Sequence, residues 1–124
     1  MYELMVRRNF AAAHSLREYR GQCESLHGHN WKVEVFITVT ELNELGLAVD
    51  FRLLKEKADE VLKNLDHRHL NELPYFKELN PSSENIAKFI YDQLSSILND
   101  KRVKITKIST WESEDSCSSY MPPQ

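Results

Sequence analysis

Apolar and polar residues alternate along two long stretches of the chain, which predicts two β-strands. From Tyr2 to about His14 almost every second residue is apolar, and His14 keeps the same parity. From Trp31 to Val39 every second residue is apolar, with mostly polar residues between them. This period of two predicts strands that bury one face and leave the other mostly polar.

The middle of the chain changes to a helical period. An apolar stripe predicts a helix of about three turns that Asp50 can cap. Its residues are Leu54, Ala58, Val61 and Leu65. A second helix is predicted after Pro81-Ser82-Ser83, where a serine can cap and Glu84 sits favourably in the first turn.

Alternation returns from Val103 to about Glu112, which predicts a third strand. A slip in parity between Ile105 and Ile108 predicts a β-bulge, and a short last strand is expected around Tyr120. The order of two strands, two helices and two strands has no regular βαβ alternation. It predicts an α+β fold, in which an antiparallel four-stranded sheet carries two helices on one face.

Composition narrows the possible classes of protein. The 124 residues suit one domain, spanning 1–124, and a net charge of −3 with mixed signs argues against a nucleic-acid partner. We find no signal peptide and no apolar stretch near the ~20 residues of a membrane helix, so we expect a cytoplasmic protein without a membrane partner. Cys23 and Cys117 are too few for a disulfide framework, and we expect free thiols.

Three histidines are placed to share a metal ion. His27-Gly28-His29 opens the second strand, and alternate residues of a strand point to the same face. His14 ends the preceding strand and brings a third nitrogen to the same place if the two strands pair. Three protein ligands leave one position of a zinc ion open, as in catalytic sites. We predict a zinc site here, and the alternative is three ordinary surface or core histidines.

Cys23 and Asp66-His67 are candidates for proton transfer. A cation close to Cys23 would favour the reactive thiolate, and a buried, inert thiol is the alternative. Asp66 can orient His67 and stabilise its protonated form, and the alternative is a polar helix end where histidine complements the dipole. The carboxylate of Glu112 is able to bind guanidine-like nitrogen edges through two parallel hydrogen bonds.

Together these residues resemble the 6-pyruvoyltetrahydropterin synthase / 6-carboxytetrahydropterin synthase family, and most closely its bacterial-type branch. The elements Cys-x-x-x-His-Gly-His and Leu-Asp-His-x-x-Leu-Asn are specific, and the matching segments cover nearly the whole chain in the family's order. These segments are Phe10-Ala11-Ala12-Ala13-His14, Cys23-Glu24-Ser25-Leu26-His27-Gly28-His29-Asn30, Val49-Asp50-Phe51, Leu65-Asp66-His67-Arg68-His69-Leu70-Asn71, Asn80-Pro81-Ser82-Ser83-Glu84-Asn85, and Trp111-Glu112 with Tyr120.

The resemblance implies the tunnelling fold (T-fold), in which subunits join their sheets into barrels. Six subunits typically assemble as two trimers, and the active sites lie at subunit interfaces. By the family pattern Zn²⁺ is held by His14, His27 and His29.

The resemblance also implies roles for residues around the metal. Cys23 is similar to the family's general base, and Asp66 and His67 to its proton-relay partners. Glu112 matches the carboxylate that anchors the amino-pyrimidine edge of the pterin ring and is often counted with the relay. Ser83 lies in a segment that also contacts pterin.

The family substrate is 7,8-dihydroneopterin triphosphate. In the bacterial branch this lyase chemistry gives 6-carboxy-5,6,7,8-tetrahydropterin, triphosphate and acetaldehyde, an early step toward 7-deazapurines and queuosine. The alternative is the animal branch, which stops at 6-pyruvoyltetrahydropterin. The short, cytoplasmic-looking chain resembles the bacterial branch more.

Glu24 is the basis for a third alternative product. It directly follows Cys23, and in part of the family a glutamate at this place goes with formation of 6-hydroxymethyl-7,8-dihydropterin, a folate precursor. The alternative is a solvated loop carboxylate. Two further hypotheses come from other classes: a pterin-binding member without turnover, and a metal-free aldolase of the same fold acting on dihydroneopterin. The intact set of histidines and proton-transfer residues disfavours the first, and the zinc histidines disfavour the second.

Overall fold

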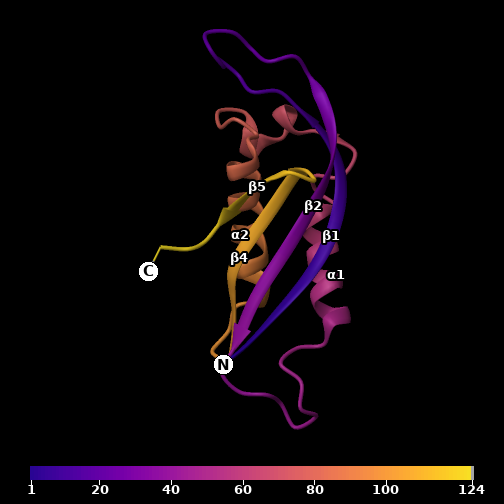
Figure 1. Cartoon of the computed structure of the whole chain (residues 1–124), viewed down its shortest axis with the longest axis vertical. Helices are drawn as coiled ribbons and strands as arrows, with labels where there is room; N and C mark the ends of the chain where they lie inside the picture. The colour runs from indigo at the N-terminus through magenta and orange to yellow at the C-terminus, as the bar shows by residue number, and fades with distance from the viewer. Residues whose placement is uncertain (124) are drawn as a thin grey trace.

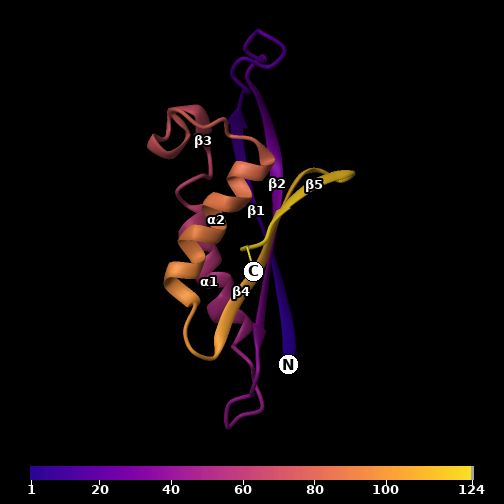
Figure 2. The same cartoon turned by 90° about the vertical axis from the view of Figure 1, so that its left-hand side faces the viewer.

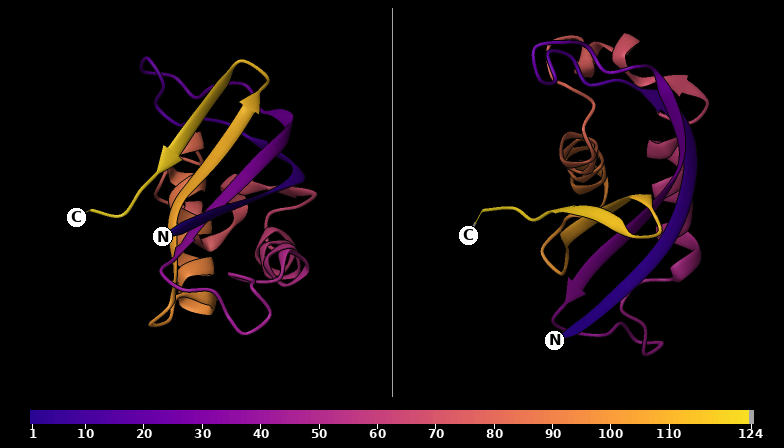
Figure 3. Two further views of the ribbon diagram at one scale, coloured as in Figure 1. Left: turned by 60° about the horizontal axis from the view of Figure 1, so that its bottom comes forward. Right: turned by 45° about the horizontal axis from the view of Figure 1, so that its top comes forward.

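Two long strands form the centre of the sheet. In the computed structural model, which describes residues 1–123, β1 (Tyr2–His14) and β2 (His27–Val39) pair antiparallel along their whole lengths. Figure 3 shows them as one curved double ribbon. Both predicted strands are confirmed, and the second begins at the first histidine of the His-Gly-His element.

The sheet continues on the other side of β2. There β4 (Val103–Ser113) pairs antiparallel with β2, and β5 (Ser116–Tyr120) pairs antiparallel with β4. The bulge predicted in the third strand is confirmed at Thr106, because its neighbours Ile105 and Lys107 face consecutive residues of β2.

The sheet has five strands, so the prediction of four was one short. A two-residue strand, β3 (Arg68–His69), pairs parallel with β1, which gives the order β3-β1-β2-β4-β5. Asp66 accepts a hydrogen bond from the Ala11 amide (2.9 Å), and the His67 amide donates to the Ala11 carbonyl (2.6 Å). These bonds hold the segment beside β1, and two residues are too few to show alternation. Two short 3₁₀-helices follow: Leu70–Glu72 and Pro74–Phe76.

Both α-helices lie on the same face of the sheet, as predicted (Figures 1 and 2). α1 (Phe51–Leu62) begins after Asp50, whose carboxylate accepts a first-turn amide at 2.8 Å. α2 (Ser83–Leu98) begins after Ser82, whose hydroxyl accepts a first-turn amide at 3.1 Å. The caps satisfy amides that have no partner inside the helix, so both helix starts are well defined.

The core lies between the helices and the helix-facing side of β1, β2 and β4. Aliphatic side chains from both layers are completely buried, and burial of each Val, Leu or Ile side chain among them stabilises the fold by about 1.5–3 kcal/mol. Prominent members are Val33, Val35, Ile37, Leu54, Ala58, Ile86, Ile90 and Leu94. Within the described residues, no helix combines the length and apolar character needed to cross a membrane.

The connection between β1 and β2 projects beyond the helices (Figure 1). Two asparagines hold its start by paired hydrogen bonds. Asn71 accepts from the Ser15 amide (3.0 Å) and donates to the Ser15 carbonyl (2.8 Å). Asn80 makes the same two bonds with Arg17, at 2.8 and 3.2 Å. The segment that carries Cys23 therefore leaves β1 along a defined path.

Candidate metal centre and active site

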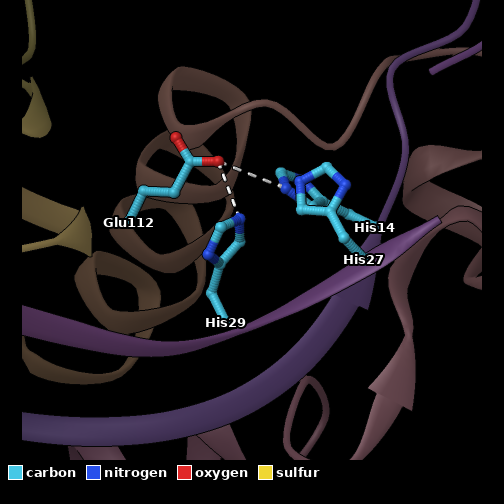
Figure 4. Close-up of side chains that lie close together, drawn as sticks. All are labelled: His14, His27, His29 and Glu112. Carbon is cyan, nitrogen blue, oxygen red and sulfur yellow. Dashed lines mark ion pairs between the residues drawn. The ribbon is translucent and has the colours of Figure 1, made fainter. Parts of the chain in front are cut away.

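The three histidines predicted as metal ligands come together where β1 ends and β2 begins. His14 lies directly opposite His27 in the strand pair, and His29 follows two residues along on the same face. Their ring centroids lie 4.7, 5.2 and 4.8 Å apart in the three pairs. Figure 4 shows the rings gathered around one point.

Backbone carbonyls orient two of the rings. Nδ1 of His14 lies 2.7 Å from the Pro81 carbonyl oxygen, and Nδ1 of His27 lies 2.8 Å from that of Ser25. A carbonyl oxygen only accepts, so each Nδ1 carries the proton and donates. The Nε2 lone pairs of His14 and His27 are then free to bind a metal, an arrangement typical of metal-binding histidines.

Glu112 reaches the cluster from β4. Its Oε1 lies 2.9 Å from Nε2 of His29 and 3.4 Å from Nε2 of His14 (Figure 4). One ligand atom from each of the four residues lies within 4.8 Å of all the others. Nε2 of His14 and Nε2 of His29 are both buried, and neither has a hydrogen-bond partner among the described residues. Buried polar atoms without a partner are costly, and a bound metal ion would satisfy them.

The charge state of the cluster also suits a metal. Burial lowers the pKa of His29, and the neighbouring histidines act in the same direction, although the carboxylate of Glu112 opposes them. His29 is therefore neutral near pH 7, which is the form that binds metals. Three imidazoles with one carboxylate nearby fit a divalent transition metal.

A cavity of about 300 Å³ opens beside the cluster. Its lining includes His14 and Glu112 together with two predicted substrate-binding residues, Glu24 and Ser83. The Ser83 hydroxyl donates a hydrogen bond to the carbonyl oxygen of Thr110 in β4 at 3.1 Å. It also lies 2.8 Å from the Thr110 hydroxyl. The start of α2 is thereby tied to the strand that carries Glu112.

Glu24 turns inward rather than into solvent. Its Oε1 accepts a hydrogen bond from the Leu16 amide (3.2 Å) and lies 3.9 Å from Nδ1 of His27. The neighbouring Cys23 is an exposed thiol in the same segment, and it is not among the residues that line the cavity. Of the two candidate residues in this loop, only Glu24 faces the histidines within one chain.

Asp66 and His67 form a pair beside β1, at the β3 edge of the sheet. One oxygen of Asp66 lies 3.0 Å from Nδ1 of His67, while the other accepts the Ala11 amide. The hydrogen bond from Ala11 lowers the pKa of Asp66, the contacts with His67 add to this, and partial desolvation opposes it only in part. The pair lines a different cavity, of about 750 Å³, together with Lys32 and Trp111.

Comparison with known proteins decides the family. The sequence profile described as 6-pyruvoyl tetrahydropterin synthase matches residues 3–123. This chain belongs to the 6-pyruvoyl tetrahydropterin synthase family. The predicted enzyme class, a lyase of the tetrahydropterin synthase type, is thereby confirmed.

Relatives in the family carry more than one activity in their names. A Pyrococcus furiosus protein named dihydroneopterin monophosphate aldolase is 36% identical over 112 residues, which are 90% of each chain. A 6-carboxy-5,6,7,8-tetrahydropterin synthase from Synechocystis is 37% identical over 69% of each chain. The Bacillus subtilis protein of that name is 32% identical over 91% of this chain and 79% of its own.

Solved structures of the family share the fold. The 6-pyruvoyl tetrahydropterin synthase of Caenorhabditis elegans superposes with a TM-score of 0.81 over 99% of this chain and 98% of its own, at 24% identity. The Plasmodium falciparum protein gives 0.77 over 96% of each chain, at 25% identity. The predicted T-fold is confirmed, with the additional strand β3.

Some parts of the site were not predicted from the sequence. Cys117 and Tyr19 also line the metal-side cavity, and Trp31 packs edge-on against the rings of His14 and His29, with centroids 5.1 and 5.3 Å away. Trp31 was recognised only as part of an alternating pattern. Cys117 had no signal, because its place depends on how β5 pairs with β4.

Proposed function

We propose that this chain is a zinc-dependent enzyme acting on 7,8-dihydroneopterin triphosphate. With one water, the substrate gives 6-carboxy-5,6,7,8-tetrahydropterin, triphosphate and acetaldehyde. The observation that carries the proposal is the His14, His27, His29 and Glu112 cluster beside a cavity of small-molecule size. Relatives at 32% and 37% identity are named for this reaction, which supports it. The product belongs to queuosine and 7-deazapurine biosynthesis.

The cluster suits the chemistry that the reaction needs. A zinc ion held by the three histidines would supply a Lewis acid, able to polarise the side-chain hydroxyls or the carbonyl formed from them. Glu112 also lines the cavity, where its carboxylate would accept hydrogen bonds from the amino-pyrimidine edge of the pterin. Ser83 lies on the same cavity and fixes its wall.

Proton transfer is assigned to Cys23, Asp66 and His67. Cys23 removes a proton from the substrate side chain as a thiolate, and His67 returns a proton at another carbon. Asp66 orients His67 through the 3.0 Å contact with Nδ1. Because Asp66 holds that nitrogen, Nε2 of His67 is the atom that exchanges the proton.

The active site is completed by a second copy of the chain. Asp66 and His67 line a cavity that includes none of the cluster residues. A second cavity holds His67 and His29 but not His14 or Glu112, so within one chain the relay does not share a cavity with the whole cluster. We infer a homo-oligomer, a hexamer built as two trimers, in which one copy presents Asp66 and His67 to the cluster of its neighbour. The protein is proposed to be cytoplasmic, with a small-molecule substrate.

A second candidate product is 6-hydroxymethyl-7,8-dihydropterin, for folate synthesis. The observation that favours it is the inward position of Glu24, which lies on the metal-side cavity while Cys23 does not. A carboxylate there is placed to act as a general base on the substrate side chain. The relative named dihydroneopterin monophosphate aldolase supports side-chain cleavage in this part of the family.

Product analysis tests both candidates. Zinc-loaded protein is incubated with 7,8-dihydroneopterin triphosphate and, separately, with the monophosphate, and the pterins are resolved by chromatography and mass. Mainly carboxytetrahydropterin with acetaldehyde supports the main proposal, and 6-pyruvoyltetrahydropterin would overturn it in favour of the animal-type product. The absence of any turnover would leave a pterin-binding protein.

Two variants separate the candidate bases. Cys23→Ala should abolish the carboxy product, and Glu24→Ala should remove only the hydroxymethyl product. If Glu24→Ala leaves the product ratio unchanged, the second candidate is excluded. Retained activity on the monophosphate after chelation of zinc would favour a metal-free aldolase.

A further inference from the structure

Glu34 is a buried carboxylate on the sheet face away from the helices. It is 8% exposed, and both of its oxygens have partners. Oε2 accepts from Nη2 (2.7 Å) and Nε (3.2 Å) of Arg7, which lies opposite in the β1–β2 pair. Oε1 accepts from the indole N–H of Trp111 at 2.6 Å. A buried charge with every oxygen satisfied holds its partners firmly.

The contact with Trp111 is diagonal across the sheet. Glu34 lies opposite Ser109 in β4, and Trp111 is two residues further along. Diagonal neighbours of this kind come into contact only through long or aromatic side chains. The indole thus connects the centre of the sheet to the last residues of β4.

Glu112 follows Trp111 at an irregular point of β4. Trp111 lies opposite Cys117 in β5, and Ser113 lies opposite Ser116, so Glu112 falls in a bulge without a partner. Bulges leave the extra residue outside the ladder and redirect its side chain. Among the described residues, the ion pairs of the Glu112 carboxylate are those with His14 and His29.

We propose that Glu34, acting through Trp111, is a positioning residue that aims Glu112 at the metal cluster and the pterin-binding cavity. The bulge frees Glu112 from the ladder, and the indole anchored by Glu34 fixes the backbone just before it. The inference deepens the proposed function, because it assigns how the pterin-anchoring carboxylate is held.

Glu34 keeps its charge under working conditions. Burial acts to raise its pKa, but the hydrogen bonds from Arg7 and Trp111 outweigh burial, and Lys107 adds to them, so the pKa lies below the ordinary value. The anchor is therefore a permanent carboxylate, and replacing it with an amide weakens its hold on both partners.

Three variants and a matched control test the proposal. Glu34→Gln removes the charge, and Trp111→Phe removes the N–H donor but keeps a ring. Glu112→Gln is the reference for loss of the anchor itself. The control is Asp59→Asn, because Asp59 makes a comparable two-pronged pair with Arg8 (2.9 and 2.9 Å) on the helix side and does not lead to Glu112.

The first readout is binding of neopterin, an unreactive fluorescent pterin, alongside KM and kcat. We expect Glu34→Gln and Trp111→Phe to weaken neopterin binding and raise KM roughly tenfold, with little change in kcat. Losing the alignment of one charged hydrogen bond lowers binding affinity by about this factor. Asp59→Asn should leave both unchanged. In a Glu112→Gln background, Glu34→Gln should add almost nothing, because its effect passes through Glu112.

The second readout does not depend on the reaction. Crystal structures of Trp111→Phe and of the parent protein should differ in the position of Glu112, with its carboxylate turned away from His29. If the substrate assignment is wrong, this comparison still decides the positioning role. Additive losses in the double variant, or an unmoved Glu112, would overturn the proposal. If Glu34→Gln does not fold, Trp111→Phe carries the test.

Discussion

The carboxylate of Asp66 bridges the Ala11 amide, at 2.9 Å, and Nδ1 of His67, at 3.0 Å. One side chain thus both ties β3 to β1 and selects the tautomer of the histidine beside it. His67 itself has a positive φ of 58°, a backbone conformation that ordinary residues adopt only when their surroundings require it. The pair combines a structural bond with an orienting one.

Asp66→Asn separates these two roles. The amide oxygen still accepts from Ala11, so the fold should be kept, but His67 loses its charged partner. We expect kcat to fall by roughly 10²-fold or more, as when an orienting carboxylate is lost from a histidine. Asp92→Asn, which removes a comparable surface ion pair with Lys88, should leave kcat unchanged. Equal losses in both variants would mean that Asp66 contributes only stability.

Metal binding should depend on the three-histidine cluster. His27→Ala removes one ligand, and we expect zinc affinity to fall by more than about 100-fold, beyond the loss seen when only an outer partner of a ligand is removed. His69→Ala is the control, because His69 pairs with Glu72 at 3.2 Å, outside the cluster. Competition with a fluorescent chelator measures the affinity. Zinc should also raise the Tm of the parent protein but not that of His27→Ala.

The paired hydrogen bonds between Asn71 and Ser15, which hold the start of the β1–β2 connection, give a stability prediction. Asn71→Asp removes the donor to the Ser15 carbonyl and places a negative charge beside it, so we expect the free energy of unfolding to fall by ~1–3 kcal/mol. Asn64→Asp makes the same exchange at an exposed turn and should change it little. Urea unfolding compares the two. An equal effect at both positions would show that the hydrogen bonds between Asn71 and Ser15 do not stabilise the loop.

Glu34 should make stability depend on pH in a defined direction. Its folded pKa lies below the unfolded value of about 4.3, so the extra stability is present above that pH and is lost as the pH falls through the folded pKa. The stability gap between the parent protein and Glu34→Gln should therefore shrink as the pH falls below about 4.3. A gap that stays constant or widens on acidification would contradict the assignment.

How far the sequence reveals this site depends on the range of the interactions. Strand alternation and the spacing of His27 and His29 are local, and pairing of β1 with β2 then brings His14 opposite His27. Only the family resemblance implied that Glu112 belongs to the site. The residue pattern could not show its approach to the cluster, because this depends on a bulge that exists only once β4 and β5 have paired. The strand β3 likewise depends on side-chain and backbone bonds from Asp66 and His67 to Ala11 rather than on any pattern.

A site shared between copies predicts complementation. His27→Ala lacks a metal ligand, and His67→Ala lacks the relay, so each alone should be inactive. When both chains are co-expressed, an oligomer can bring an intact cluster from one chain to an intact relay from the other, and activity should return. The control pair is His27→Ala with His29→Ala, in which both defects lie in the same cluster. No mixture of these two restores a complete cluster, so activity should stay absent. Absence of recovery in the first pair, with oligomers shown to mix, would mean that metal and relay meet within a single chain.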